Sequence, residues 1–403
     1  MVEISVVFPA YNAVDYMDEA MNSIINQSFK DLEIICIDDG STDNTLEVLQ
    51  SYASKDDRIQ VYHQENKGAG GASIAGISKA KGKYIYLMDA DDLLDLNALE
   101  ELYNIMEEKK LDFVIFKAIN YNQDTGKYFE DKYFAMPHFY ECVGDSVFYW
   151  KDIGNSIFDI CVTPWSKLYR RDLFENILED YPGRLIFHDN ILFFRILFNS
   201  KRVFFYDKFL YTYRIHSSSL VNAHNEKSVQ TIEANNLIVK TFMDYGHFED
   251  YKVTLYNRKI HLVNKRYGLI RDDLKEYFFT EMKKDFEKII GHEKYDDFYS
   301  NLYPRHRVYF DNVIQSNNHV EYDLRNEISS LKTDNSNKEN DIKLLKSDNR
   351  KLKNEMKSLK NENKKLNKEA NDLTKFKKSI LSSKSWKLTK PFRAFMNFFR
   401  KKK

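Results

Sequence analysis

Aromatic and acidic side chains follow three of the apolar runs in the N-terminal sequence. The first run leads into Pro9-Ala10-Tyr11-Asn12, the second into Asp38-Asp39-Gly40-Ser41-Thr42-Asp43, and the fourth into Asp89-Ala90-Asp91-Asp92. Carboxylates that share one place repel each other unless a cation or a donor-rich ligand compensates their charge. Mg²⁺ or Mn²⁺, bound by one or two carboxylates and by phosphate oxygens, is such a cation. The pattern therefore predicts a divalent metal that bridges Asp91 to a diphosphate.

Predicted strands and predicted helices, which would position these groups, alternate along residues 1–118. Short apolar runs separated by helix-length segments are typical of βαβ units and a parallel sheet covered on both faces. In such a sheet, ligands bind outside the carboxyl ends of the strands. The predicted strands are Ile4–Phe8, Leu32–Ile37, Arg58–Tyr62, Tyr84–Met88 and Asp112–Phe116, and the predicted helices are Val14–Gln27, Thr42–Ser54, Gly70–Ala80 and Asn97–Lys109.

The following two hundred residues are less regular. Residues 119–220 are rich in aromatic side chains and become strand-like again at Arg202–Tyr206 and Leu210–Ile215, whereas residues 221–315 are helical in pattern. We therefore expect an α/β domain at 1–220 and a helical region at 221–320.

Composition and missing motifs exclude several classes of protein. The 403 residues include only three cysteines, far apart, which argues against a disulfide framework and against a cysteine zinc site. The chain has neither the glycine-rich loop of dinucleotide-binding and P-loop proteins nor the GxSxG and HExxH motifs of hydrolases. Ten Lys/Arg and no Asp/Glu follow Phe376, so the preceding part is acidic, with 51 basic and 61 acidic residues. This distribution argues against nucleic-acid binding.

A heptad pattern runs from residue 324 to residue 380. Its d positions are almost all leucine, and three of its a positions are Asn335, Asn349 and Asn363. Asparagine at a favours a parallel two-stranded coiled coil, because each buried amide needs a partner amide. We therefore predict a homodimer.

Residues 384–403 form a basic, amphipathic tail. After Pro391, a helix would place Phe392, Phe395, Met396 and Phe399 on one face, and Trp386 precedes it. An apolar face with cations and no acids is typical of an interfacial helix on anionic lipid. A disordered tail, or one that docks on the protein's own body, is the alternative. No run of 18 apolar residues predicts a membrane-spanning helix.

Several segments together resemble the inverting glycosyltransferases of family 2, which have the GT-A fold, a Rossmann-like domain with a mostly parallel sheet. The resemblance covers about residues 1–220 and is typical of enzymes of bacterial and archaeal surface polysaccharides. The matching segments are Phe8-Pro9-Ala10-Tyr11-Asn12, Asp38–Asp43, Glu65-Asn66-Lys67-Gly68, Asp89-Ala90-Asp91 as the DxD motif, Pro164–Tyr169 and Phe187-His188-Asp189-Asn190.

The resemblance implies roles for individual residues. Pro9, Tyr11, Asp39, Asn66, Asp89 and Arg214 would bind the nucleotide-sugar, with Tyr11 against the base, Asp39 accepting from a base N–H and Asp89 near the ribose and diphosphate. Asp91 would bind Mn²⁺ or Mg²⁺. His216 would be either a further metal ligand or a structural histidine. Asp189 falls where the family has its catalytic base, although His188 replaces the usual Glu of that motif.

One departure concerns the donor. Where the family usually has Ala-Arg-Asn, this chain has Ala72-Ser73-Ile74, so a cation expected near the donor is absent from that position. The identity of the nucleotide and sugar therefore stays open, with a UDP-sugar favoured.

The combined prediction is a metal-dependent inverting hexosyl- or N-acetylhexosaminyltransferase. It would move a sugar from a nucleotide-diphosphate sugar to a hydroxyl of a surface polysaccharide, teichoic-acid-like polymer or lipid-linked acceptor. A homodimer would associate with the inner face of the plasma membrane from the cytoplasm. The alternatives are a membrane-tethered coiled-coil scaffold with an inactive transferase domain and a nucleotidyltransferase, which normally carries a glycine-rich phosphate loop near its N-terminus.

Overall fold

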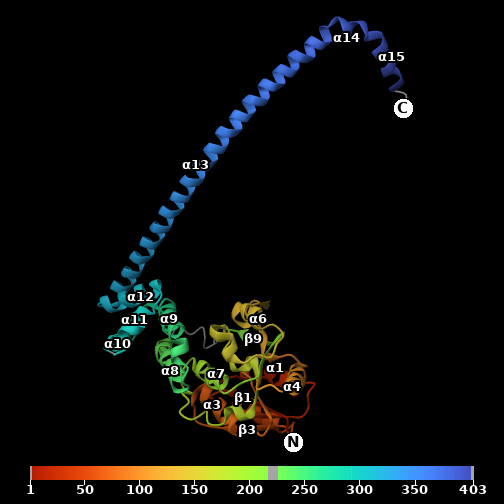
Figure 1. Cartoon of the computed structure of the whole chain (residues 1–403). Helices are drawn as coiled ribbons and strands as arrows, with labels where there is room; N and C mark the ends of the chain where they lie inside the picture. The colour runs from red at the N-terminus through yellow and green to blue at the C-terminus, as the bar shows by residue number, and fades with distance from the viewer. Residues whose placement is uncertain (1, 217–225, 292, 401–403) are drawn as a thin grey trace. The chain divides into compact units, whose positions relative to one another are not determined.

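The computed structural model describes residues 2–216, 226–291 and 293–400 (Figure 1). The chain divides into two compact units, Met1–Asp323 and Leu324–Lys403. The predicted boundary at residue 220 and the last three residues of the predicted tail lie outside the described residues.

The first unit is built on one nine-stranded mixed sheet. Its strands occur in the order β3-β2-β1-β4-β8-β6-β9-β5, and β7 pairs with β6 outside this path. Strands β1 to β4 are parallel, as predicted, whereas β8 runs antiparallel to both β4 and β6. The strands are β1 (Ile4–Ala10), β2 (Leu32–Asp38), β3 (Ile59–His63), β4 (Tyr84–Leu87), β5 (Leu93–Leu94), β6 (Phe113–Asn122), β7 (Lys127–Phe129), β8 (Lys167–Arg170) and β9 (Val203–Ile215).

Strand β9 corrects one prediction. The two predicted strands Arg202–Tyr206 and Leu210–Ile215 form one continuous strand, which pairs in parallel with β6. The register shifts between Phe116 and Ala118, so the polar residues that looked like a break between two strands lie in an irregular stretch of one strand. Because β6 and β9 run in the same direction as β4, their carboxyl ends lie at the same edge of the sheet.

Helices cover both faces of the sheet. Along β1, Val6 and Phe8 share a core with residues of α1 and α4, whereas Val7 lies in a second core with residues of α7. This division follows from the alternation of side chains along a strand. The helices of this part are α1 (Val14–Ile25), α2 (Thr45–Ala53), α3 (Gly68–Ile77), α4 (Ala98–Lys109), α5 (Lys132–Ala135), α6 (Pro137–Val143) and α7 (His188–Phe198), with 3₁₀ turns η1 (Trp150–Phe158), η2 (Pro164–Ser166) and η3 (Arg171–Phe174).

The region predicted to be helical is helical. Its buried side chains, such as Phe242, Phe278 and Phe310, continue the core that contains α7 and Val7. A buried ion pair joins Lys259 Nζ to Asp285 Oδ2 at 2.6 Å. The elements are η5 (Glu226–Gln230), α8 (Thr231–Asp244), α9 (Phe248–Tyr267), η6 (Asp272–Leu274), α10 (Lys275–Ile290), α11 (Tyr295–Ser300) and α12 (Pro304–Gln315).

The second unit is dominated by one helix, α13 (His319–Ser382), which continues without a break through the predicted heptads (Figure 1). Two short helices follow, α14 (Lys384–Leu388) and α15 (Lys390–Arg400). Apolar side chains at the a and d positions are about half to two-thirds exposed in the single chain: Ile328, Leu331, Ile342, Leu345, Leu352, Met356, Leu359, Leu366 and Leu373. Among the described residues, no helix is both long and apolar enough to cross a membrane.

Candidate active site

Three carboxylates that follow β4 lie close together. One ligand oxygen from each of Asp89, Asp91 and Asp92 lies within 4.8 Å of the others. Burial, and then the charges of Asp91 and Asp189, raise the pKa of Asp89 to about 8. The structure therefore brings Asp189, which is a hundred residues away in the sequence, into the electrostatic reach of this cluster.

Asp92 is buried, and its carboxylate is used by the protein itself. Its Oδ2 accepts a hydrogen bond from the Tyr211 hydroxyl at 2.7 Å, and its Oδ1 accepts one from the backbone N–H of Arg214 at 2.7 Å. These contacts join the end of β4 to β9. Asp92 thus fixes the cluster to the sheet.

Arg214 is buried and makes polar contacts in three directions. Its Nε donates to the backbone carbonyl of Asp91 at 2.7 Å, its Nη1 to Gln123 Oε1 at 2.6 Å, and its Nη2 pairs with Glu19 Oε2 at 2.5 Å. Its guanidinium lies 5.1 Å from the ring centre of Tyr16. Arg214 therefore positions the backbone of Asp91, and its role in binding the diphosphate stays a prediction.

His216 lies beside the predicted metal ligand. Its Nε2 is 3.0 Å from Asp91 Oδ2, and its ring packs on that of Tyr16 with centroids 4.4 Å apart. Asp91 keeps about a third of its side chain exposed. Two groups named as metal ligands from the sequence are thus adjacent in space.

Asp189 lies in the first turn of α7, where the left-handed backbone of Phe187 (φ 72°) begins the helix abruptly. Asp189 Oδ1 is 3.0 Å from His188 Nδ1, and the side chain is about one-third exposed. Burial lowers the pKa of His188, but the adjacent Asp189 carboxylate outweighs this effect and the net shift is upward. The Tyr181 hydroxyl also contacts His188 Nδ1, at 2.5 Å.

Asp39, at the end of β2, is buried and organises the loop between β3 and α3. Its Oδ1 accepts hydrogen bonds from Gln64 Nε2 at 2.7 Å and from the Lys67 amide at 2.8 Å, and its Oδ2 accepts one from the Gly68 amide at 2.8 Å. Asn66 lies in this loop and is exposed. Asp39 and Asn66, both predicted for the nucleotide, are thus parts of one loop structure.

Pro9 and Tyr11 lie at the end of the neighbouring strand. Pro9 pairs in register with Ile37, inside β1. Tyr11 follows the strand and is 51% exposed, with its ring available at the surface. The Asn12 side chain fixes this turn by accepting a hydrogen bond from the Thr42 amide at 2.8 Å. The structure places both residues beside β2, the strand that Asp39 follows.

A segment before α7 packs against the start of α3. A Cβ added to Gly183 would lie 2.5 Å from the Gly71 backbone nitrogen, and one added to Gly70 would lie 2.9 Å from Gly183. Next to this contact, Arg184 Nη2 donates to the Asn66 carbonyl at 3.2 Å. The arginine therefore reaches the loop that Asp39 organises.

The sequence did not assign a role to two of these cations. Lys167, inside the segment Pro164–Tyr169, is fully buried; its Nζ donates to the carbonyls of Cys161 at 2.6 Å and Thr163 at 2.8 Å, and burial lowers its pKa to about 8. Its place in a family motif was a signal that it matters. Arg184 has no such signal, because only the fold brings it to Asn66.

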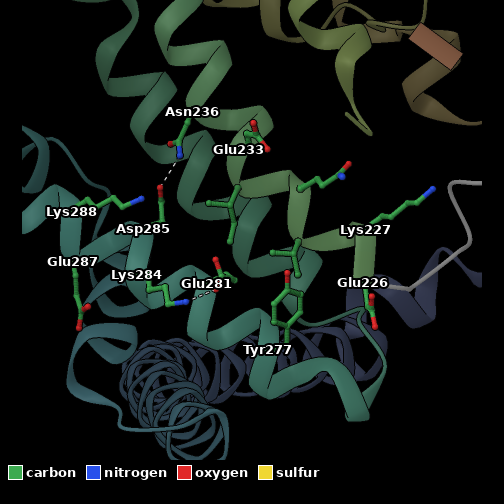
Figure 2. A pocket seen from close by; sticks show the side chains of 13 residues that line it. Glu226, Lys227, Glu233, Asn236, Tyr277, Glu281, Lys284, Asp285, Glu287 and Lys288 are labelled. Atoms are coloured by element: carbon green, nitrogen blue, oxygen red, sulfur yellow. Dashed lines mark hydrogen bonds and ion pairs between the residues drawn. The ribbon is translucent and has the colours of Figure 1, made fainter. Parts of the chain in front are cut away.

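A separate open pocket of about 890 Å³ lies between η5, α8 and α10 (Figure 2). It is lined by side chains of both charges, among them the pair Lys284–Glu281 at 2.7 Å, and Asn236 Nδ2 donates to Asp285 Oδ1 at 2.7 Å. Its lining includes none of the residues predicted for catalysis or donor binding.

Comparison with known proteins gives a consistent family. Residues 5–178 match the model described as glycosyl transferase family 2. The chain is 34% identical over 231 residues to the glycosyltransferase GlyG of Streptococcus pneumoniae serotype 4, across 56% of this chain and 75% of that protein. It is 29% identical over 280 residues to the cholesterol galactosyltransferase of Borreliella burgdorferi, across 62% and 75% of the two chains.

Solved structures that resemble this chain are less similar to it in sequence. The crystal structure of S. aureus TarS 1-349 in complex with UDP-GlcNAc is 18% identical, and the similarity covers 75% of this chain and 93% of that one with a TM-score of 0.46. The family match, together with the mixed α/β sheet and the acids at its strand ends, confirms the GT-A fold expected from the sequence. The chain belongs to glycosyl transferase family 2.

Proposed function

We propose that this glycosyltransferase is metal-dependent and inverting, and that it moves a hexosyl or N-acetylhexosaminyl group from a nucleotide-diphosphate sugar, favoured to be a UDP-sugar, to an acceptor hydroxyl. The observation that carries the proposal is the cluster of Asp89, Asp91 and Asp92, whose ligand oxygens lie within 4.8 Å of one another. Asp189 lies near enough to add to the rise in the pKa of Asp89 that burial and Asp91 cause.

The carboxylate cluster fits a divalent cation. Asp91 is partly exposed and has His216 beside it, whereas Asp92 is already satisfied by Tyr211 and Arg214. We therefore assign Mn²⁺ or Mg²⁺ to Asp91, with Asp89 and His216 in supporting positions. When bound, the metal supplies charge compensation for the leaving diphosphate.

Asp189 is the proposed general base. A displacement at the anomeric carbon requires the acceptor hydroxyl to lose a proton, and a carboxylate within hydrogen-bond reach can take it. Asp189 is partly open to solvent and is held from one side by His188. A base on the side opposite the leaving group gives a single displacement with inversion of configuration.

The loop held by Asp39 is the proposed nucleotide site, with Tyr11 against the base. A carboxylate offers about four acceptor positions, and three are used by Gln64, Lys67 and Gly68. One position therefore remains for a base N–H. Arg184, which reaches Asn66, is the proposed replacement for the cation absent at Ser73.

Turnover of a nucleotide-sugar tests the proposal. With Mn²⁺ and a panel of UDP- and GDP-sugars, the full-length protein should release the nucleoside diphosphate, and Asp91→Asn should reduce this rate by about a hundredfold or more. Asp57→Asn, at an exposed position, is the matched control and should keep the rate. If the wild-type protein turns over no donor, or if Asp91→Asn behaves like the control, the catalytic assignment is wrong and the inactive scaffold is favoured.

We further propose that the second unit makes a parallel homodimer and binds an anionic membrane surface. The apolar heptad seam is exposed in the single chain, which favours a second copy of the helix as its partner. In the tail, Phe392 and Phe395 are more than half exposed, and the Arg393 guanidinium stacks 3.4 Å from the centre of the Trp386 ring. These features support attachment to the cytoplasmic face of the plasma membrane, where glycan or lipid-linked acceptors are made.

Vesicle sedimentation tests the membrane proposal. The full-length protein should pellet with phosphatidylglycerol-containing vesicles and release at high salt. The pair Phe392→Ser and Phe395→Ser should weaken pelleting, whereas Asn397→Ser should not. Equal pelleting with neutral phosphatidylcholine vesicles would contradict the proposal.

A further inference from the structure

A row of aromatic and cationic side chains crosses three adjacent strands at the edge of the sheet. Tyr128 of β7 pairs in register with Tyr121 of β6, and Tyr121 pairs in register with Arg214 of β9. Directly opposite residues share one face of a sheet. The rings of Tyr128 and Tyr121 have centroids 4.7 Å apart, and the Arg214 guanidinium lies 5.8 Å from the ring of Tyr121.

The row ends at the carboxylate cluster. Arg214 lies against the ring of Tyr16, and Tyr16 packs on His216, whose Nε2 is 3.0 Å from Asp91 Oδ2. Each member therefore contacts the next, from the proposed metal ligand to an exposed hairpin.

The row lies on the side of the cluster opposite to the proposed nucleotide site. In the sheet order, β1 and β2, which are followed by Tyr11 and Asp39, lie on one side of β4. β6, β7 and β9 lie on the other side. Adjacent strands are about 4.8 Å apart, so Tyr128 lies about 10 Å from the strand that carries Arg214. An extended ligand that reaches Asp91 from this side would pass over the row.

The outer end of the row is open to solvent. Tyr128 is 58% exposed, and Tyr121 is partly buried beneath the same face. An exposed aromatic ring beside a second ring offers apolar surface on which an apolar ligand face can pack. The C–H face of a pyranose ring has this character, while its hydroxyls reach polar neighbours such as Gln123, which also accepts a hydrogen bond from Arg214.

We infer that Tyr128 and Tyr121 form a stacking platform for a pyranose ring of the acceptor glycan. This inference rests on the proposed glycosyl transfer, because it assigns the acceptor side of that reaction. It names a sugar as the part of the acceptor that the protein recognises beyond the reactive hydroxyl.

The hairpin contains its own matched control. Phe129 follows Tyr128 on β7 and is 44% exposed, but neighbouring side chains on a strand point to opposite faces. Phe129→Ala therefore removes a ring from the same strand and leaves the row of Tyr128, Tyr121 and Arg214 intact.

The experiment is saturation-transfer NMR of the full-length protein with maltotetraose, cellotetraose and chitotetraose. At least one should bind the wild-type protein saturably, and Tyr128→Ala should raise its dissociation constant by about three- to tenfold. Tyr128→Trp should restore binding, and Phe129→Ala should leave it unchanged. If none of the three binds, or if Tyr128→Ala and Phe129→Ala behave alike, the inference is wrong.

Donor turnover separates this failure from failure of the proposed function. Release of nucleoside diphosphate in the presence of Mn²⁺ and water alone, without glycan, should be the same in Tyr128→Ala and wild type. Normal donor turnover without glycan binding would overturn the platform alone. Absent donor turnover in the wild-type protein would overturn the catalytic proposal on which the platform rests.

Discussion

The edge of the sheet and the long helix α13 differ in how they expose their side chains. At the sheet edge, charged groups such as Asp92 and Arg214 are buried and satisfied by the protein's own groups. On α13, apolar groups such as Leu352 and Leu359 remain exposed in the single chain. Burying charge and exposing apolar surface both cost free energy unless a partner compensates. The first pattern therefore indicates charged groups that the fold itself holds in place, and the second indicates a surface for another helix.

The comparison predicts that the two regions fail independently, and Asp189→Asn should show the largest effect. Without the carboxylate, no base accepts the acceptor proton, so the transfer rate should fall by about 10²- to 10⁴-fold. The oligomeric mass should change little, because the substitution leaves the heptad seam of α13 intact, and the dissociation constant for UDP should change little, because Asp189 is assigned to the acceptor and not to the nucleotide. Steady-state kinetics, calorimetry and sedimentation measure the three quantities. A near-normal transfer rate in a folded variant would remove Asp189 from the mechanism.

Substitution on the heptad seam should give the reverse result. Leu352→Glu together with Leu359→Glu would place charges inside a helix pair, which weakens association by about a thousandfold or more. Analytical ultracentrifugation should then show a monomer, while donor turnover per chain stays normal. Asn354→Glu with Asn361→Glu makes the same charge change outside the seam and should remain a dimer. A wild-type monomer would contradict the coiled-coil proposal.

Gly183→Ala tests the contact between the segment before α7 and the start of α3. The new Cβ would lie 2.5 Å from the Gly71 nitrogen, so the two backbones must separate. We expect a loss of about 1–3 kcal/mol in the free energy of unfolding and a higher KM for the donor. Gly126→Ala, where an added Cβ meets nothing within 4 Å although φ is +66°, controls for the glycine itself. Equal donor KM values for both variants would show that this contact does not shape the donor loop.

Arg184→Ala should give the smallest effect. Loss of a charge-assisted contact to a phosphate costs about 1.5–3 kcal/mol when it is buried and less at an exposed position such as this one. We expect the donor KM to rise by about three- to tenfold with kcat nearly unchanged, and Arg184→Lys to recover part of it. Arg202→Ala, immediately before the start of β9, is a control that should keep the donor KM. An unchanged donor KM for Arg184→Ala would show that Arg184 does not take the place of the cation that is absent at Ser73.

Much of the fold follows from local sequence, because buried parallel strands are short apolar runs. Strands β1 to β4 begin and end within about two residues of their predictions. Strands β5, β7 and β8 were missed, since they have only two to four residues, and β5 and β8 are defined by partners far along the chain. Strand β9 was divided in two because Asp207 and Lys208 interrupt its apolar pattern.

In the candidate site, too, some features follow from local sequence and others depend on residues far apart in the chain. The acids at strand ends were identified from their positions, and their grouping follows from parallel topology. The contacts of Arg184 with Asn66 and of Tyr121 with Arg214 join residues about 90 to 120 positions apart. No local pattern predicts such contacts, because they depend on the register of β6 with β9 and on the packing of Gly183.

The central claim is that Asp91 holds a divalent cation together with a nucleoside diphosphate. Electron paramagnetic resonance of Mn²⁺ titrated into the full-length protein, with and without UDP, measures this binding directly. We predict that UDP strengthens Mn²⁺ binding in the wild-type protein and that Asp91→Asn weakens it by at least about tenfold. Binding that is the same in both proteins, or that does not respond to UDP, would contradict the account.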